Sequence, residues 1–581
     1  WSHATQQFPF RRGINGGVIG NLRSISSPFP DDPPLEGEPE EIEPTGYNSL
    51  SRQKSTTEAP QTIAFGQSPT TNTIDNIILG AIKQSRTIAD PIAESYSLGQ
   101  RGRLYELTQD YEQAQGLTQK ALRLTEEMSF PDGRYRWEWQ QGRLFSRQGQ
   151  RQEAILAYGN AVKTLKEIRS NLLFIDAEVQ FSFRDNAEPV YRELVELLLS
   201  AEKTELDEST LDLAVQQIDN LQLSELENFL RCDLTGTTTI TQFEVDANTA
   251  VLHPIILKNR LGVISQFQDK KEFTDFDISE KEVETAIEQI RSDLSLAPDR
   301  TPEIRDTAKL LHQWLIAPIE DELKQRDIKT LVFVLDGSLR NIPMAVLFDG
   351  EKYLVEKYAI AVAPELELFT PTPLTSDLKV FTGGVGTPQE IGDLSFATIK
   401  NLDAELDVIS ELFGPQPPVT NQNFNGRTLQ AQLSTGNFSG IHIKTHGLFS
   451  SDPEETFIVG YNELIKGEAL GNLIQSGSRQ GATPIELLVL SACSTATGDN
   501  RAILGLAGIA VRAGARSTLS TLWEAEDGPN TQLMIRFYQE LKKPNITRAD
   551  ALRNAQLALI NEDGYKAPHL WSTYVLVGNW R

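Results

Sequence analysis

The sequence predicts an α/β fold preceded by a helical region, and three observations support this prediction. From residue 329 onward, short apolar runs rich in β-branched residues alternate with amphipathic stretches. Runs of this kind are typical of strands in a sheet that helices cover on both faces. Residues 76–231 show helical patterning and contain an internal repeat. Between these two regions, residues 235–280 alternate apolar and polar side chains as strands do.

Residues 1–75 have the composition of a disordered leader or linker. Residues 31–44 hold seven acidic residues, four prolines and no basic residue, and a stretch rich in Ser, Thr, Gln and Pro follows. Such a segment buries too little apolar surface to offset the backbone entropy lost on folding, which is about 1–2 kcal/mol per residue. We therefore expect it to act as a solvated spacer.

The repeat within residues 76–231 consists of Gly102-Arg-Leu-Tyr105 and Gly142-Arg-Leu-Phe145, each followed by alanines at matching spacing. It resembles the tetratricopeptide repeat, although the two copies lie farther apart than the usual period of about 34 residues. We assign the excess to a loop at residues 129–133, where Pro131 and Gly133 would break the helix. The resemblance implies a surface that binds a protein partner; plain helical bundle packing is the alternative.

Residues 235–581 are predicted to form the second folded region. Within it, residues 235–328 form a β-meander and two helices that lead into an α/β core over residues 329–581. In the first part we predict strands at 237–245, 251–257 and 262–267 and helices at 280–296 and 302–325. In the core we predict strands at 330–335, 358–362, 378–382, 440–444, 486–491, 517–522 and 573–577, and helices at 401–413, 427–433, 503–512, 531–541 and 548–561.

Composition excludes several classes of function. The net charge of −26 argues against binding to nucleic acid or an anionic membrane, because phosphate binding needs a basic face. Two cysteines exclude a disulfide scaffold or a cysteine-rich zinc module. No apolar run approaches the length of a membrane span, and no signal peptide is evident, so we expect a cytoplasmic location.

Reactive side chains follow two of the predicted core strands. The strand at 440–444 is followed by His446 and Gly447, and the strand at 486–491 is followed by Cys493. Ligands bind beyond the carboxyl ends of strands in open α/β sheets, and a nearby histidine favours the nucleophilic thiolate of a cysteine. A cysteine beside an apolar run can instead be an inert core residue.

The motifs around these residues resemble those of the CHAT domain over residues 235–581. This family comprises caspase-like cysteine peptidases that are commonly joined to tetratricopeptide repeats and are related to separase. The resemblance implies a caspase-like sheet covered by helices on both faces. It is carried by Leu335-Asp-Gly-Ser-Leu-Arg-Asn-Ile-Pro343-Met-Ala-Val-Leu347, Lys444-Thr-His446-Gly447, Leu490-Ser-Ala-Cys493-Ser-Thr-Ala-Thr-Gly498, Leu522-Trp523 and His569-Leu-Trp-Ser-Thr-Tyr-Val-Leu-Val-Gly578.

The resemblance implies a cysteine endopeptidase that cleaves protein substrates with a His446–Cys493 dyad. His446 would be the general base and Cys493 the nucleophile, and the backbone amides of Gly447 and Cys493 would form the oxyanion hole. No cofactor or metal is implied. The alternative function is a non-catalytic interaction scaffold with a pseudo-peptidase domain.

Acidic residues after the Leu522-Trp523 pair are candidates for the P1 pocket. In separase-like relatives an acidic residue in this region recognises a basic P1 side chain, and Asp527 matches that position best. Glu524 and Asp499 are the substitutes. Alternatively, these carboxylates cap the helix that begins near Gly528, where negative charge is favourable.

His442 lies four residues before His446, so the two side chains would share one face of the strand. We expect His442 to pack beside the dyad and position it by a hydrogen bond. With His446 and Cys493 it could instead form a three-ligand zinc site, although no fourth ligand is evident.

Overall fold

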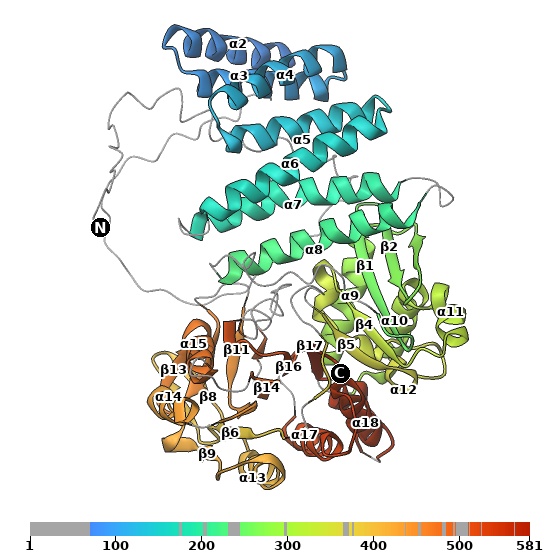
Figure 1. Cartoon of the computed structure of the whole chain (residues 1–581), viewed down its shortest axis with the longest axis vertical. Coiled ribbons are helices and arrows are strands. Elements are labelled where there is room, and N and C mark those ends of the chain that lie inside the picture. The colour runs from blue at the N-terminus through green and yellow to red at the C-terminus, as the bar shows by residue number, and fades with distance from the viewer. Residues whose placement is uncertain are drawn as a thin grey trace, which may run out of the picture. The chain divides into compact units, whose positions relative to one another are not determined.

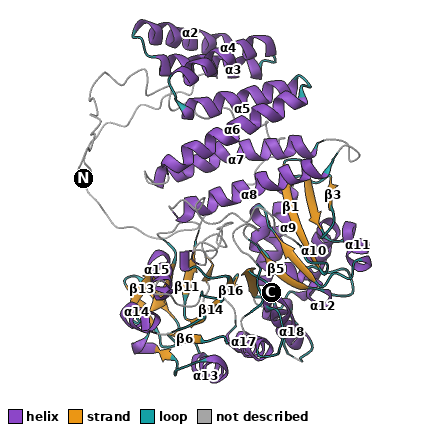
Figure 2. Ribbon diagram, viewed as in Figure 1, coloured by secondary structure: helices purple, strands orange, loops and turns teal. Residues whose placement is uncertain are grey.

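The computed structural model describes residues 70–172, 177–200, 206–230, 245–295, 299–363, 371–374, 377–435, 437–450, 455–478, 484–491, 494–495, 509, 512–523, 526–562 and 564–581. Residues 1–69 and Cys493 therefore lie outside the described residues. Within these ranges, no helix is long and apolar enough to cross a membrane. The described chain divides into a helical region and an α/β region (Figures 1 and 2).

The helical region consists of successive helices, most of them joined by short turns (Figure 1). The first four helices each have 17 residues and begin at positions 71, 91, 111 and 131, at a constant interval. Each turn after them contains one residue in the left-handed conformation, which is a common way to end a helix: Ala89, Gln109, Ser129 and Gly149. The helices are α2 (Thr71–Thr87), α3 (Pro91–Leu107), α4 (Tyr111–Glu127), α5 (Pro131–Arg147), α6 (Arg151–Leu172), α7 (Ala177–Leu199) and α8 (Glu208–Leu230).

The wide spacing of the repeat arises from long helices, and the predicted loop at residues 129–133 is wrong. Pro131 is the first residue of α5, where its missing N–H costs nothing, and Gly133 lies inside that helix. The repeated glycines do mark close helix contacts. A Cβ on Gly142 would lie 2.8 Å from the ring of Tyr158, which belongs to α6.

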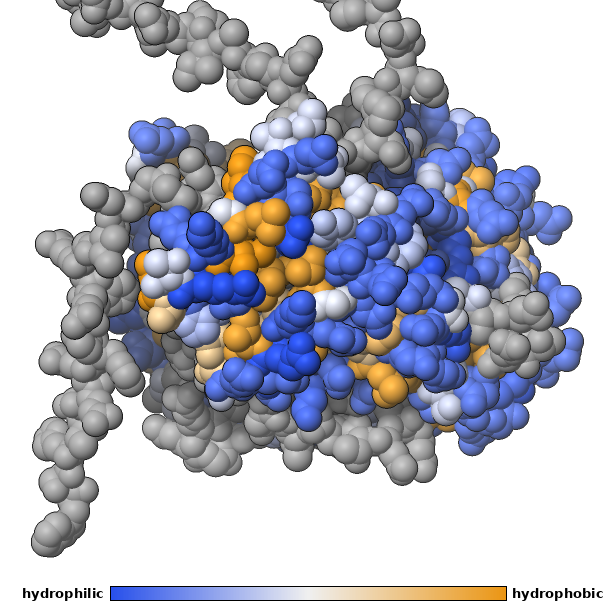
Figure 3. Space-filling view, turned by 90° about the horizontal axis from the view of Figure 1, so that it is seen from above, coloured by the Kyte–Doolittle hydropathy of each residue, from blue (hydrophilic) through white to orange (hydrophobic). Residues whose placement is uncertain are grey.

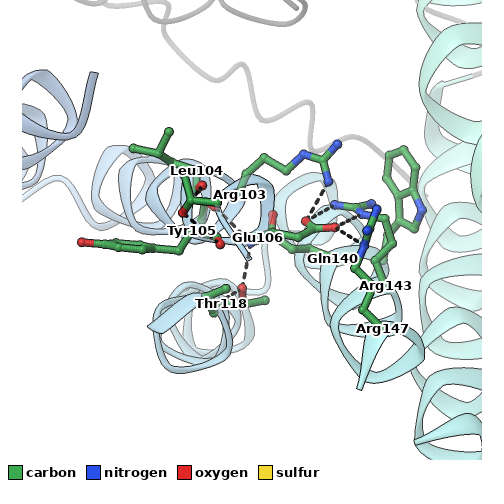
Figure 4. Close-up of polar contacts among 12 residues, drawn as sticks. Arg103, Leu104, Tyr105, Glu106, Thr118, Gln140, Arg143 and Arg147 are labelled. Carbon is green, nitrogen blue, oxygen red and sulfur yellow. Dashed lines mark hydrogen bonds and ion pairs between the residues drawn. The ribbon is translucent and has the colours of Figure 1, made fainter. Parts of the chain in front are cut away.

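Buried charge also joins α3 to α5. The Glu106 carboxylate is buried and accepts two hydrogen bonds from Arg143, at 2.9 and 3.2 Å. Arg103 and Arg147 complete the cluster from more exposed positions (Figure 4). Burial would raise the pKa of Glu106, but the guanidinium groups of Arg143 and Arg103 together outweigh burial, and the pKa lies below its ordinary value. The carboxylate therefore remains charged between the two helices.

The α/β region is built on one mixed, mostly parallel sheet of 11 strands in the order β3-β2-β1-β4-β5-β17-β16-β14-β10-β6-β9. The meander strands are part of this sheet, because β1 pairs in parallel with β4. The strands are β1 (Thr249–Leu257), β2 (Arg260–Gln266), β3 (Lys271–Phe276), β4 (Thr330–Phe333), β5 (Ala359–Val362), β6 (Val380–Gly384), β9 (Val419–Thr420), β10 (Gly440–Lys444), β14 (Leu487–Ser491), β16 (Ser517–Thr521) and β17 (Tyr574–Gly578).

Two smaller sheets lie beside the main one. One has the order β13-β12-β11-β15, and the other is the hairpin β7-β8. Their strands are β7 (Gln389–Ile391), β8 (Leu394–Phe396), β11 (Gly447–Phe449), β12 (Phe457–Gly460), β13 (Glu463–Lys466) and β15 (Ser494–Thr495). Both small sheets adjoin the carboxyl end of β10.

Helices cover both faces of the main sheet, as predicted. Ile441 and Ile443 of β10 pack in one apolar cluster with residues of α14 and α15, whereas Val489 of β14 packs in another with residues of α17 and α18. The helices are α9 (Glu280–Ser295), α10 (Thr301–Leu315), α11 (Glu320–Gln325), α12 (Leu354–Lys357), α13 (Leu402–Phe413), α14 (Gly426–Thr435), α15 (Gly467–Ser478), α17 (Asp527–Leu541), α18 (Arg548–Ile560) and α19 (Pro568–Trp571).

Three predicted elements need comment. The helix at 302–325 is two helices, because the chain leaves α10 at residue 316 and passes through a 3-10 turn containing Pro318 before α11. The strand at 237–245, apart from its last residue, and most of the helix at 503–512 lie outside the described residues.

Candidate active site

Two neighbouring segments of the chain carry the predicted dyad. β10 and β14 pair in parallel, and their last residues, Lys444 and Ser491, lie opposite each other. The same two segments pair again farther along, where Leu448 of β11 lies opposite Ser494 of β15. Position 446 lies between these two pairings on the first segment. Cys493 follows Ser491 on the second segment and lies outside the described residues.

The His446 ring is held by residues 396 and 397. Its Nε2 lies 2.8 Å from the carbonyl oxygen of Ala397, and the ring of Phe396 lies 5.7 Å away between centroids, tilted by 32°. A carbonyl can only accept a hydrogen bond, so Nε2 carries the proton, and in the neutral imidazole the lone pair lies on Nδ1. The ring therefore presents Nδ1 as its basic atom.

The backbone around His446 is fixed as well. The Val459 N–H of β12 donates to the His446 carbonyl oxygen at 2.7 Å. The next residue, Gly447, is buried and begins β11, where it lies opposite Ile458. His446 itself is partly exposed, so the imidazole can be approached from solvent.

Asp527, predicted for the P1 pocket, contacts the segment that holds His446. As the first residue of α17 it accepts a hydrogen bond from the Lys400 N–H through Oδ2, at 2.9 Å. Glu524 and Asp499 lie outside the described residues. Glu526, the residue directly before Asp527, is the N-cap of α17 and makes no side-chain capping bond.

His442 occupies a different environment from the one predicted. It is fully buried, with Nε2 3.0 Å from Glu405 Oε1 and Nδ1 3.2 Å from the Tyr538 hydroxyl. Both partners belong to helices, α13 and α17, that cover the sheet. The prediction that His442 bonds to the dyad is therefore wrong. The shared-face argument fails because β10 ends at Lys444, so His446 does not continue the strand's alternation.

Lys444 completes a buried polar network with Glu405. Its ammonium donates to Glu405 Oε2 at 2.5 Å and to the Thr531 hydroxyl at 3.0 Å. Thr531 in turn donates to Glu405 Oε2 at 3.0 Å. The three side chains are at most 4% exposed, so the charges are compensated inside the protein.

The electrostatics of this network keep Glu405 ionised. Burial alone would raise its pKa, but the Lys444 ammonium and the hydrogen bond from His442 outweigh burial, and the pKa lies below its ordinary value. Burial and the Glu405 charge together raise the pKa of Tyr538 well above its ordinary value, so the phenol remains neutral. Its hydroxyl can then donate to His442 Nδ1.

The sequence did not indicate the members of this network that belong to helices, Glu405, Thr531 and Tyr538. It also did not indicate the Ala397 carbonyl. One signal was available, because a lysine inside a buried strand requires a buried anion as its partner. Nothing local indicates that the partner is Glu405. Glu405 belongs to α13, and three elements, including α14, lie between α13 and β10 in the chain. Among the described residues, no group of three or more His, Cys, Asp or Glu side chains is arranged to hold a metal ion.

Comparison with known families identifies the α/β region. The CHAT-domain family model matches residues 305–579. The chain carries a CHAT domain. The match covers β4 to β17 and both segments that carry the predicted dyad, and it confirms the resemblance drawn from the motifs. No curated protein matches the chain in sequence.

Several solved structures are similar to the chain around and beyond the CHAT domain. The Saccharomyces cerevisiae separase–securin complex at 2.6 Å is 11% identical, with a TM-score of 0.40, and the match covers 88% of this chain and 50% of that one. The chain thus spans about half the length of that separase. The Porphyromonas gingivalis RgpB pro- and mature-domain complex is 9% identical, with a TM-score of 0.31, and covers 52% and 76%. The Arg-specific cysteine proteinase gingipain R is 10% identical, with a TM-score of 0.33, and covers 58% and 79%.

Proposed function

We propose that this CHAT-domain chain is a cysteine endopeptidase in which His446 is the general base and Cys493 the nucleophile. The observation that carries the proposal is the register of the two paired segments. The pairs Lys444–Ser491 and Leu448–Ser494 bracket position 446 on one segment and position 493 on the other. Neighbouring parallel segments in this register favour contact between the two side chains.

The proposed chemistry follows from the orientation of His446. Nδ1 accepts the thiol proton of Cys493, and the resulting thiolate attacks the peptide carbonyl carbon. The tetrahedral oxyanion is bound by the amides of Gly447 and Cys493. As the C–N bond breaks, the imidazolium returns the proton to the leaving amine, and water then hydrolyses the acyl-enzyme with His446 again as base.

A basic P1 side chain is part of the proposal. Asp499, which follows Cys493, and Glu524, which follows Leu522-Trp523, would pair with an Arg or Lys of the substrate, whereas Asp527 accepts a hydrogen bond from the Lys400 N–H. Cleavage of a peptide panel by the full chain tests this preference. Replacement of P1 Arg by Leu should lower kcat/KM by at least tenfold, and an unchanged rate would exclude an acidic P1 pocket.

We further propose that the helical region consists of tetratricopeptide repeats that bind a protein partner and regulate the CHAT domain. Exposed apolar side chains gather at the α2 end of the chain (Figure 3), a feature typical of interaction surfaces. Five of them lie on α2, on α3 and in the turn between these helices: Ile77, Leu79, Ile88, Ile92 and Leu107.

A buried ion pair provides a connection through which the helical region could act. Arg192 of α7 donates two hydrogen bonds to Asp336, at 2.8 and 3.0 Å, and Asp336 also accepts from the Ile256 N–H. Arg340 pairs with Glu225 of α8 at 2.8 Å. Asp336 and Arg340 belong to the first CHAT motif. The variant Arg192→Met should therefore change peptidase activity or its dependence on a partner, and unchanged values of both would exclude this route.

Covalent labelling tests the peptidase proposal. An electrophilic peptide probe with P1 Arg is applied to the full chain and to Cys493→Ala, His446→Ala and Cys232→Ala, and adducts are measured by intact mass. We expect Cys493→Ala and His446→Ala to abolish labelling and Cys232→Ala, the matched control, to leave it unchanged. Labelling that survives His446→Ala but not Cys493→Ala would indicate an exposed but unactivated thiol and favour the non-catalytic scaffold.

A further inference from the structure

Both contacts described for the His446 ring, one from a side chain and one from a backbone carbonyl, come from residues 396–400. The Phe396 ring lies against the imidazole, and the Ala397 carbonyl accepts from Nε2. The exact position of this short segment therefore decides where Nδ1 points. A displacement of about 1 Å at a catalytic group can lower a rate by about a hundredfold.

The 396–400 segment is held at both ends. At its start, Phe396 closes the β7–β8 hairpin by pairing with Gln389. Near its end, the Ile399 N–H donates to the Gly386 carbonyl oxygen at 3.0 Å, and the Lys400 N–H donates to Asp527 Oδ2 at 2.9 Å. The first two attachments join the segment to nearby residues of the chain. Asp527 attaches it to α17, which is distant in the sequence.

We propose that Asp527 is a positioning residue for His446. Its carboxylate holds the Lys400 amide, which fixes the 396–400 segment and thereby the carbonyl that orients the imidazole. This inference rests on the proposed function in one respect, that His446 is the catalytic base. It assigns Asp527 a role different from recognition of a basic P1 side chain.

The two roles of Asp527 place different demands on its side chain. Recognition of an Arg or Lys side chain requires negative charge. The bond to the Lys400 N–H requires only an acceptor oxygen at that place. Asn keeps such an oxygen and is tolerated at helix N-termini, whereas Ala removes it. The pair Asp527→Asn and Asp527→Ala therefore separates the two roles.

The experiment measures cleavage of matched peptides with P1 Arg and P1 Leu by the full-length variants. For Asp527→Asn we expect kcat/KM within about threefold of the unmodified chain on both peptides. For Asp527→Ala we expect a loss of at least tenfold on both peptides, expressed in kcat. Glu526→Gln, the neighbouring acid without a capping bond, is the matched control and should change neither. A loss confined to the P1 Arg peptide, equal in the Asn and Ala variants, would overturn the inference.

A second measurement does not depend on turnover. The ring protons of His446 are followed by NMR in the same variants, with His446→Gln used to assign the signals. We expect Asp527→Ala to shift the His446 resonances and to speed exchange of the Nε2 proton, and Asp527→Asn to leave them unchanged. Unchanged resonances in Asp527→Ala would overturn the positioning role. Absence of cleavage by the unmodified chain, with Cys493 labelling independent of His446, would instead refute the proposed peptidase while this measurement still decides the role of Asp527.

Discussion

Replacement of Glu405 by Gln should destabilise the carboxyl end of β10 strongly. Glu405 offers two charged oxygens, one to His442 and the other to Lys444 and Thr531. Gln offers one neutral acceptor, and its NH2 group would face a donor. The ammonium of Lys444, a residue that is 2% exposed, would then lack a counter-charge inside the protein.

The size of the effect follows from the geometry. At the 2.5 Å separation of Lys444 Nζ and Glu405 Oε2, Coulomb attraction at an effective dielectric constant of about 20 is roughly 7 kcal/mol. Desolvation of both charges offsets part of this attraction. Removal of one partner from a buried pair typically costs about 3–5 kcal/mol, because the other charge remains buried. We therefore expect Glu405→Gln to lower the free energy of opening of β10 by about 3–5 kcal/mol.

Native-state hydrogen exchange measures this local free energy in the full chain, without assuming that all 581 residues unfold together. The amides of residues 440–444 are compared in the unmodified chain, Glu405→Gln, Lys444→Met and the double variant. The double variant should cost at least about 2 kcal/mol less than the sum of the single variants, since it leaves no unpaired charge. A cost below about 1 kcal/mol for Glu405→Gln, or additive single effects, would refute the reasoning.

Three further predictions concern stability. Glu106→Gln should lower the opening free energy of α3 and α5 by about 3 kcal/mol in hydrogen exchange, because it leaves the Arg143 guanidinium unpaired. Gly384→Ala should cost about 1–3 kcal/mol by urea unfolding, since its Cβ would lie 1.8 Å from a β10 carbonyl oxygen, whereas Gly116→Ala meets nothing within 4 Å and should cost nothing. Burial lowers the pKa of His253 to about 3, so the unfolded chain binds a proton below about pH 6.5 and the folded chain does not. Stability should fall by about 1.4 kcal/mol per pH unit as the pH falls from about 6 to about 3, and His253→Leu should remove this part of the slope.

The central strands of the sheet were predictable because they are buried on both faces. Each predicted core strand begins or ends within two residues of an observed one, since a run of β-branched residues bounded by polar ones has few other structures available. Helix boundaries were harder to predict where the same residue type can either break a helix or begin one. Pro131 was interpreted as a helix breaker, yet it begins α5, and the wide interval between the repeated glycines reflects helix length rather than a loop.

The candidate site shows the same difference. Residues that a local sequence pattern marks could be predicted, whereas contacts between segments distant in the sequence could not. His446 and Gly447 directly follow a predicted strand, so the local sequence marks them as candidates, and the resemblance to the CHAT domain supplies their predicted roles. Ala397 acts through its carbonyl oxygen, which every residue possesses, and therefore no side-chain pattern could reveal it. Asp527 was predicted from the sequence as an acidic residue of the P1 pocket, whereas its contact with the Lys400 amide depends on how α17 meets the segment after β8.

This division bears on how the CHAT domain could be controlled. The proposed nucleophile and base lie on adjacent paired segments, whereas the groups that orient the base come from residues 396–400 and α17. α17 also contacts β10 directly, because Thr531 and Tyr538 bond to Lys444 and His442. A shift of α17 would therefore reach His446 by two routes, through the Lys400 amide and the Ala397 carbonyl and through the strand that precedes His446. The geometry thus couples the direction of Nδ1 to the packing of α17 against the sheet.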